Sequence, residues 1–314
     1  MHETARMLWL LVAAGPASWP GRLLGEARGL FSYRFMVNAY EAGTIVAVMA
    51  ALVGWFMVLR RQTFAGHTLS VVAFPGAAAA ILLGVSAGLG YYGFCLAAAL
   101  VIAVAPRGSA AAGGFSQESA VIGTVQAFAL ASGFLFVALY HGFLESVNSL
   151  LFGTFLGITN GQVIVLLVVA LGVVAVLALV GRPLLFASID PAVAAVHGVP
   201  VRLLGGVFLV LLGLTAAATT QVTGALLVFA LLVMPAATAQ RLTARPAVSL
   251  ILSVGIALGV IWVALAIAYY TPYPLGFWVT SVAFGLYVAA TLSTAARHRD
   301  ARRAAHLTGL DQAA

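Results

Sequence analysis

The sequence predicts an all-α protein, a polytopic bundle of about eight to nine transmembrane helices with one short helix on its cytoplasmic side. Of the 314 residues, 63% are hydrophobic and only 7% are charged, and the mean hydropathy is +1.11. Soluble domains carry about 25% charged residues, so the composition excludes an ordinary soluble domain. The apolar residues also form runs close to the roughly 20 residues that a helix needs to cross a bilayer.

The kinds of charged residue narrow the function further. All fifteen basic residues are arginine, so the chain lacks the lysine of a P-loop and cannot itself hold ATP in that way. The single cysteine, Cys95, excludes a disulfide framework and a thiolate metal cluster. The net charge of +7 comes from arginines that flank apolar runs rather than form one face, so we expect no nucleic-acid partner.

The first half of the chain predicts four spans. Residues 1–34 form an N-terminal interfacial segment, because their apolar patch at 7–14 is too short to cross the membrane. The first span covers 36–59, and the uncharged stretch 62–106 divides at 84–92 into two more. A Gly/Ser/Ala-rich loop at 108–119 then leads to a fourth span at 120–140.

The second half predicts five further spans. Residues 141–161 are broken by Glu145, Asn148 and glycines, which favours a re-entrant or interfacial segment. A span at 162–181 ends before Arg182. The uncharged stretch 203–240 holds two spans with a break near 219–224, and 247–296 holds two more, divided at 271–274. The predicted transmembrane domain is thus 35–296, with nine crossings, and 297–314 is a basic cytoplasmic tail.

The arginines give the predicted orientation. With alternating spans, one side of the membrane receives eleven of the fifteen basic residues. By the positive-inside rule this side is the cytoplasm, which places the C-terminus inside and the N-terminus outside, in a plasma or inner membrane. The arginines on the cytoplasmic side are Arg60, Arg61, Arg107, Arg182, Arg202, Arg241, Arg245, Arg297, Arg299, Arg302 and Arg303.

The loop at 182–202 is the one compact polar stretch between the later spans. Asp190 can cap the free amides of a first helical turn, Pro191 suits the first helical position, and Gly198 supplies a left-handed stop. The pattern predicts a cytoplasmic helix over 191–197. A helix of this length is not stable alone, so we expect it to dock on a partner.

Three stretches resemble the permeases of ABC-type metal importers, which move zinc, manganese or iron. FASIDPAVAAVHGVPVR (186–202) resembles the family's coupling-helix loop, and VLRRQTFAGHTLSVVAFPGA (58–77) and QVTGALLVFALLVMPAATAQRLT (221–243) are similar to two other signatures. The resemblance extends over about residues 36–292. It implies a non-enzymatic permease subunit without a cofactor of its own, and a separate ATPase subunit that binds ATP. The residues implied to contact this ATPase are Asp190, Pro191, Val193, Val196, His197, Gly198 and Val199.

The resemblance also implies an external metal-binding protein, a homodimer in the lipid bilayer and a pathway for a divalent metal. Many family members carry G-D-x-x-S-H in the second motif, but here His67 and Val71 occupy the Asp and His positions. The pair of ligands is broken, so His67 is the one candidate metal ligand, with a structural histidine as its alternative. Two His67 side chains could face one pathway in the dimer. The motifs place Ser70, Thr223, Met234 and Thr238 along the same pathway.

The sequence bears on three other functions. The broken ligand pair leaves open a permease for a metal chelate such as a siderophore or cobalamin. An ion-coupled secondary transporter is disfavoured, because Glu41, Glu118 and Glu145 all lie near predicted span ends. GVSAG at 84–88 matches a hydrolase nucleophile motif, but its serine falls on the outer side; close helix contacts explain these glycines, and those at 255–259, better.

Overall fold

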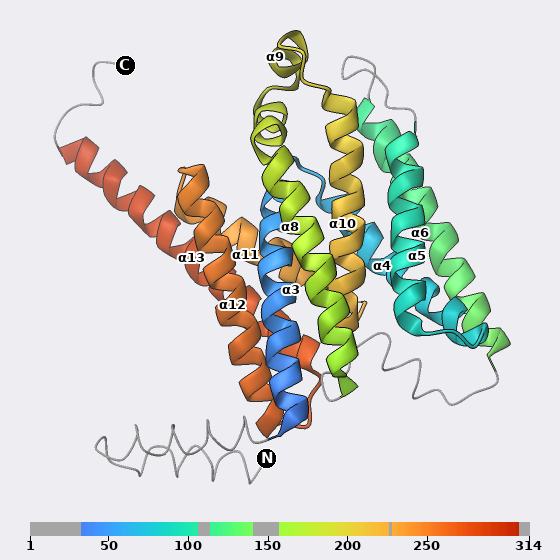
Figure 1. Ribbon diagram of the computed structural model, residues 1–314. Coiled ribbons are helices and arrows are strands. Elements are labelled where there is room, and N and C mark those ends of the chain that lie inside the picture. Colours follow the sequence, from blue (N-terminus) through green and yellow to red (C-terminus); the bar gives the residue numbers. More distant parts are fainter. Residues whose placement is uncertain (1–32, 106–113, 141–156, 226–227, 308–314) are drawn as a thin grey trace, which may run out of the picture.

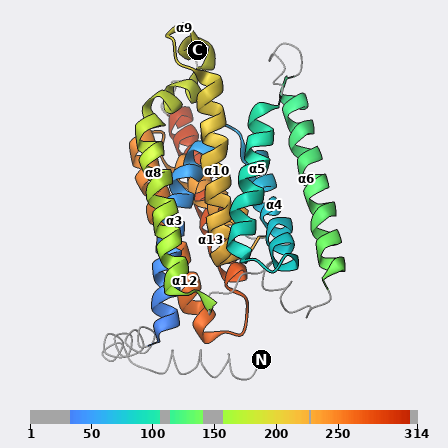
Figure 2. The same cartoon turned by 45° about the vertical axis from the view of Figure 1, so that its right-hand side comes forward.

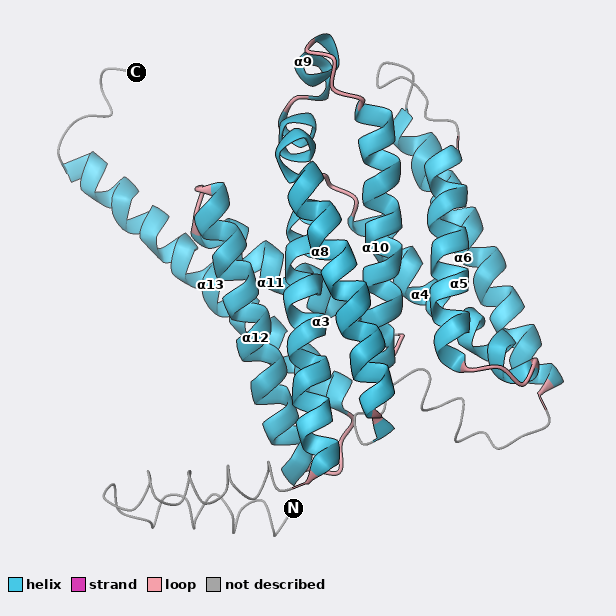
Figure 3. Cartoon of the chain, in the orientation of Figure 1, coloured by secondary structure: helices cyan, strands magenta, loops and turns pink. Residues whose placement is uncertain are grey.

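The computed structural model describes the backbone of residues 33–105, 114–140, 157–225 and 228–307, and the side chains of these residues except 114–117 and 297–307. Every regular element in these ranges is a helix (Figure 3), which confirms the all-α prediction. The helices are α3 (Arg34–Leu59), α4 (Thr63–Leu82), α5 (Ala87–Val104), α6 (Gly114–Leu139), α8 (Asn160–Ile189), α9 (Pro191–Val196), α10 (Val201–Thr223), α11 (Val228–Leu242), α12 (Pro246–Tyr270) and α13 (Leu275–Leu307).

Eight of these helices are long and apolar enough to cross a membrane. The helix at the seventh predicted crossing is shorter than expected, because α11 has only 15 residues. At 1.5 Å per residue it rises about 22 Å, short of a hydrocarbon core of about 30 Å. α11 packs against α3, α12 and α13 and is mostly buried, although Arg241 and Leu242 at its end are exposed.

Each predicted break lies at a helix end, but only 271–274 matches in length, because α5 begins inside the predicted break 84–92 and α10 continues through most of 219–224. α4 ends at Leu82, α10 at Thr223 and α12 at Tyr270. Gly84 and Gly224 have positive φ angles of 71° and 80°, a conformation that glycine adopts without the steric cost of a side chain. Local turn chemistry therefore sets where these spans end.

Three further boundaries, at the end of α8, the start of α6 and the end of α13, differ from the prediction. α8 continues eight residues beyond the predicted end at 181, because Arg182 is exposed and a charge ends a membrane crossing without ending a helix. α6 begins at Gly114, inside the predicted loop 108–119, and α13 stays helical to Leu307, well into the predicted tail. The interfacial segment up to residue 32 and most of the predicted re-entrant segment, 141–156, lie outside the described residues.

Helices α3, α4 and α10 form the centre of the bundle. Of the most apolar window in each, 67% of α3, 83% of α4 and 61% of α10 is buried, against 33% or less for the other five spans. Figures 1 and 2 show α5 and α6 on one side of this centre and α12 and α13 on the other. The outer helices expose their aliphatic side chains, as expected of a surface that faces lipid.

Glycines allow the central backbones to approach closely. A Cβ on Gly54 of α3 would lie 2.0 Å from the carbonyl oxygen of Leu232 in α11. A Cβ on Gly90 of α5 would lie 2.0 Å from the carbonyl oxygen of Gly76 in α4. Small residues at such crossings are typical of membrane helices, which gain no hydrophobic driving force from packing against one another.

The glycines expected to make helix contacts are different ones. A Cβ on Gly84, Gly255 or Gly259 would meet no atom within 4 Å, and one on Gly88 would meet only the Gln221 side chain at 3.9 Å, so these glycines make no close backbone crossing within this chain. Gly84 instead serves the turn after α4, with its positive φ. Spacing alone does not distinguish a glycine in a helix crossing from a glycine that faces outward.

Polar side chains fix the central helices to their neighbours. The indole nitrogen of Trp55 in α3 donates to the hydroxyl of Ser249 in α12 at 3.0 Å, and the Gln240 amide of α11 donates to the Trp55 carbonyl at 2.9 Å. Thr68 of α4 donates to Gln126 of α6 at 2.8 Å. These bonds are made away from bulk water, so they specify which helix faces are in contact.

Candidate functional site

The short helix α9 lies at the tip of the bundle, between the end of α8 and the start of α10 (Figure 1). The Asp190 carboxylate accepts hydrogen bonds from the amides of Ala192 and Val193, both at 3.0 Å, and Pro191 occupies the first turn. Gly198 follows with a φ of 79°. The capped helix predicted for this loop is confirmed, with His197 as its C-cap instead of its last helical residue.

The exposed surface of α9 is largely apolar. Ala194 is fully buried, whereas Val196 is 86% exposed and Val193 is 43% exposed. The His197 ring packs edge-on against Phe186 at 5.8 Å, and its Nδ1 lies 2.9 Å from the Val193 carbonyl oxygen. α9 is thus held in place while it presents valines outward, an arrangement suited to docking on another protein.

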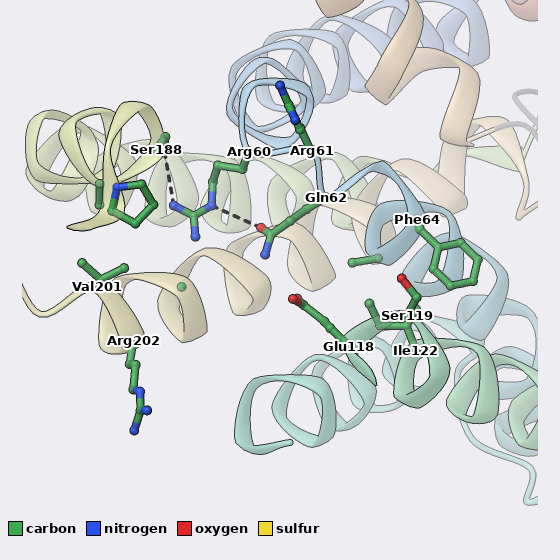
Figure 4. A pocket seen from close by; sticks show the side chains of 14 residues that line it. Arg60, Arg61, Gln62, Phe64, Glu118, Ser119, Ile122, Ser188, Val201 and Arg202 are labelled. Carbon is green, nitrogen blue, oxygen red and sulfur yellow. Dashed lines mark hydrogen bonds between the residues drawn. The ribbon is translucent and has the colours of Figure 1, made fainter. Parts of the chain in front are cut away.

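A pocket of about 310 Å³ lies beside α9, lined by residues of the α3–α4 turn, α6, α8 and α10 (Figure 4). Arg60 crosses it: its Nη1 donates to the Ser188 hydroxyl at 3.2 Å and its Nε donates to the Gln62 side chain at 3.2 Å. Its guanidinium also lies 5.3 Å from the centre of the Phe208 ring. Arg60 therefore connects the end of α3 to α8 and α10, just below α9.

The pocket carries charges of both signs. Arg61 and Arg202 line it together with Arg60, and Glu118 of α6 lines its far wall (Figure 4). Arg61 has a φ of 57°, a left-handed conformation that costs a non-glycine residue about 1–2 kcal/mol. From the sequence, these arginines predicted only the orientation, and the pocket was not predicted. The adjacent residues Arg60 and Arg61 at the end of a span were the signal that could have indicated it.

His67 lies on α4 where this helix meets α11. It is half-buried, and its ring packs edge-on against Phe229 at a centroid distance of 5.1 Å. Met234, also half-buried, lies further along α11, and Val71 is half-buried one turn after His67. The structure thus brings together the two helices predicted to line the pathway, with His67 at their contact.

The other predicted pathway residues are buried and bonded within their own helices. Ser70 donates to the Gly66 carbonyl at 2.8 Å, Thr223 to Thr219 at 3.2 Å, and Thr238 to Met234 at 2.6 Å. Hydroxyls often satisfy themselves in this way inside membrane helices. The role of these residues in a pathway stays a prediction.

Among the described residues, no group of three or more His, Cys, Asp or Glu side chains could hold a metal ion. His67 therefore belongs to no such group among these residues. His141 and Glu145, which are four residues apart in the sequence, lie outside the described residues. Ser86 precedes α5 at the end of the bundle opposite α9 (Figure 1), so Asp190 and His197 cannot form a hydrolase triad with it.

The family is decided by comparison with known proteins. The model of the ABC 3 transport family matches residues 32–294. The chain belongs to the ABC 3 transport family. This match covers every described span and α9, so the resemblance seen in three short motifs extends over the whole helical bundle. The chain is accordingly a multi-pass permease of an ABC transporter, a transport component rather than an enzyme.

Individual members of the family are similar in sequence over most of their length. The chain is 30% identical to the manganese transport system membrane protein MntC of Halalkalibacterium halodurans, over 71% of this chain and 75% of the relative. It is 31% identical to the chelated iron transport system membrane protein YfeC of Yersinia pestis, over 72% of this chain and 75% of the relative. These two relatives are named for different forms of metal.

A solved structure confirms the permease fold. The structure of PsaBC from Streptococcus pneumoniae in complex with Fab has a chain that superposes with a TM-score of 0.74 at 24% sequence identity. The match covers 85% of this chain and 95% of that one. The helical arrangement described here is thus the arrangement of an already solved protein.

Proposed function

We propose that this chain is the membrane permease of an ATP-driven importer that moves a divalent metal ion, manganese, iron or zinc, into the cytoplasm. A separate ATPase subunit binds and hydrolyses ATP, and an external protein delivers the metal. The family supports transport by an ABC permease, and relatives named for manganese and chelated iron support a metal cargo. The observation that carries the proposal within this chain is the capped, outward-facing helix α9.

The ATPase docks on α9. Val196 and Val193 present apolar surface at the tip of the bundle, and the Asp190 cap and the Gly198 turn fix both ends of the helix. Because α9 packs against α8 and α10, a movement of the docked ATPase can displace these two helices as long as α9 stays folded. Exposed valines that would otherwise contact water gain free energy when a partner covers them.

This docking places the α9 end of the bundle in the cytoplasm of a cell whose plasma membrane holds the complex. Arg60, Arg61 and Arg202 gather at that end around the pocket beside α9, in agreement with the positive-inside rule. α13 ends on the same side as α9 (Figure 1), which supports a cytoplasmic C-terminus.

The metal passes along α4 and α11, with His67 as its ligand. A neutral imidazole nitrogen suits iron and zinc, and two copies of the chain in a homodimer bring two such nitrogens to one pathway. The chain needs no resident cofactor for this role. His67 is half-buried beside Phe229, so an opening between α4 and α11 would expose it.

A second candidate cargo is a metal chelate. The position one turn after His67 is Val71, so the ligand pair expected for a bare cation is absent, and a ligand-poor pathway suits a metal that keeps its own chelator. A chelate would need fewer protein ligands and more room. The two cargoes differ in what competes for uptake: bare cations in one case, the metal-free chelator in the other.

The test is uptake by proteoliposomes that contain the permease, its ATPase and the external protein. We expect manganese, iron or zinc to accumulate only with internal ATP, and equal uptake without ATP would overturn the proposal. Val196→Glu should weaken capture of the ATPase at least tenfold, since a buried, unpaired carboxylate is costly. Val85→Glu, the same exchange in the turn after α4 at the opposite end, is the control and should leave capture unchanged.

A further inference from the structure

An apolar groove of about 870 Å³ runs between α5, α8 and α10. Figures 1 and 2 show α10 flanked by α8 on one side and α5 on the other. Aliphatic residues and glycines line it, apart from a single arginine. Gly172 and Gly206 leave it open: a Cβ on Gly172 would meet nothing within 4 Å, and one on Gly206 would only touch Ala103 at 3.7 Å.

Arg202 is the one charged residue of the groove and lies at its α9 end. It also lines the polar pocket beside α9, with Arg60 and Arg61, so the apolar groove and the basic end of the bundle meet at this side chain. From Arg202 to Leu214 the groove follows α10 for about 18 Å, at 1.5 Å per residue. One leaflet of the hydrocarbon core is about 15 Å deep, so the groove matches one leaflet with a cation at its polar edge.

The groove is separate from the proposed metal pathway. His67 contacts Phe229 where α4 meets α11, whereas the residues that line the groove all belong to α5, α8 and α10. A metal cation gains nothing from an aliphatic lining that ends in an arginine. The lining instead suits an acyl chain, and the guanidinium suits a phosphate, which it can bind in a bidentate way.

We propose that this groove binds a phospholipid with a net negative headgroup from the leaflet on the α9 side. One acyl chain lies along α10 between α5 and α8, and the headgroup phosphate pairs with Arg202. Arg60 and Arg61 add positive potential at the same end, which favours an anionic over a zwitterionic lipid. Because Arg202 lies at the start of α10, next to α9, the bound lipid supports the segment that holds the docking helix.

The test is native mass spectrometry of the full-length chain in neutral detergent, with phosphatidylglycerol and phosphatidylcholine of identical acyl chains. We expect phosphatidylglycerol to be retained preferentially and inorganic phosphate not to displace it. Arg202→Gln should lower its apparent affinity about fivefold, the effect of roughly one arginine near an anionic membrane surface. Arg245→Gln is the control, because Arg245 is exposed before α12 and does not line the groove.

The acyl chain is tested by filling the groove. Gly172→Leu should abolish retention of both lipids, whereas Gly255→Leu, which adds the same side chain at an open position of α12, should not. Equal retention of the two lipids by the unaltered chain, or no effect of Arg202→Gln, would overturn the proposal. So would disulfide cross-linking of Gly172→Cys between two copies in native membranes, because a second chain would then cover the groove.

Discussion

Removing the cap of α9 by Asp190→Ala should separate ATP hydrolysis from transport. The substitution deletes both hydrogen bonds that the carboxylate accepts, from Ala192 and Val193 at 3.0 Å. Loss of an N-cap of this kind costs about 1 kcal/mol, within a range of about 0.5–2. A six-residue helix has no stability of its own, and among its residues only Ala194 is buried. The ratio of folded to unfolded α9 should therefore fall about fivefold.

The assay measures metal taken up per ATP hydrolysed by the reconstituted complex. We expect this ratio to fall severalfold in Asp190→Ala while the protein remains in the membrane with unchanged yield. Asp190→Asn should restore the ratio, because asparagine caps a helix as well as aspartate does. If Asn behaved like Ala, the charge rather than the cap would matter. An unchanged ratio in Asp190→Ala would refute the argument that a folded α9 transmits the ATPase motion.

Three further substitutions test the pathway and the packing. His67→Ala should lower metal uptake, and His67→Phe, which keeps a ring at this position, should lower it equally; transport at the unaltered rate in the Phe variant would leave His67 a packing residue. Gly90→Ala should reduce the thermal unfolding temperature, since overpacking costs about 1–3 kcal/mol, whereas Gly255→Ala should not. Trp55→Phe should lower the stability of the protein by about 1 kcal/mol, and adding Ser249→Ala should lower it little further, because no buried hydrogen-bonding group is then left without its partner. If thermal unfolding showed that the losses from the two substitutions add up, the hydrogen bond between these side chains would not account for the effect.

The spans and α9 could be predicted because both depend on neighbouring residues. A run of about 20 apolar residues satisfies the bilayer whatever lies beside it, and the breaks at 84–92, 219–224 and 271–274 follow from local turn residues. The cap at Asp190 and the stop at Gly198 likewise act within one or two turns. For this reason the positions of the helix ends near Leu59, Leu82 and Tyr270 agree with the prediction.

The candidate pathway was predicted only in part. The motifs identified α4 and α11 as partners, and the contact between His67 and Phe229 brings these two helices together. Burial was not foreseen for Ser70, Thr223 and Thr238, whose hydroxyls bond within their own helices. Which face of an apolar helix turns inward depends on its neighbours, and a nearly uniform apolar sequence carries little periodicity from which to read that face.

The sequence by itself thus determined the class, the order of the helices, the short length and caps of α9, and the side of the membrane expected for the arginines. Only the tertiary structure decided that Gly54 and Gly90 lie at backbone crossings while Gly255 faces outward. It also placed Arg60 across α8 and α10, and Arg202 at the junction of a polar pocket and an apolar groove. Hydropathy, capping and turns act over a few neighbouring residues, whereas these contacts join residues far apart in the chain, so they exist only once the helices have packed.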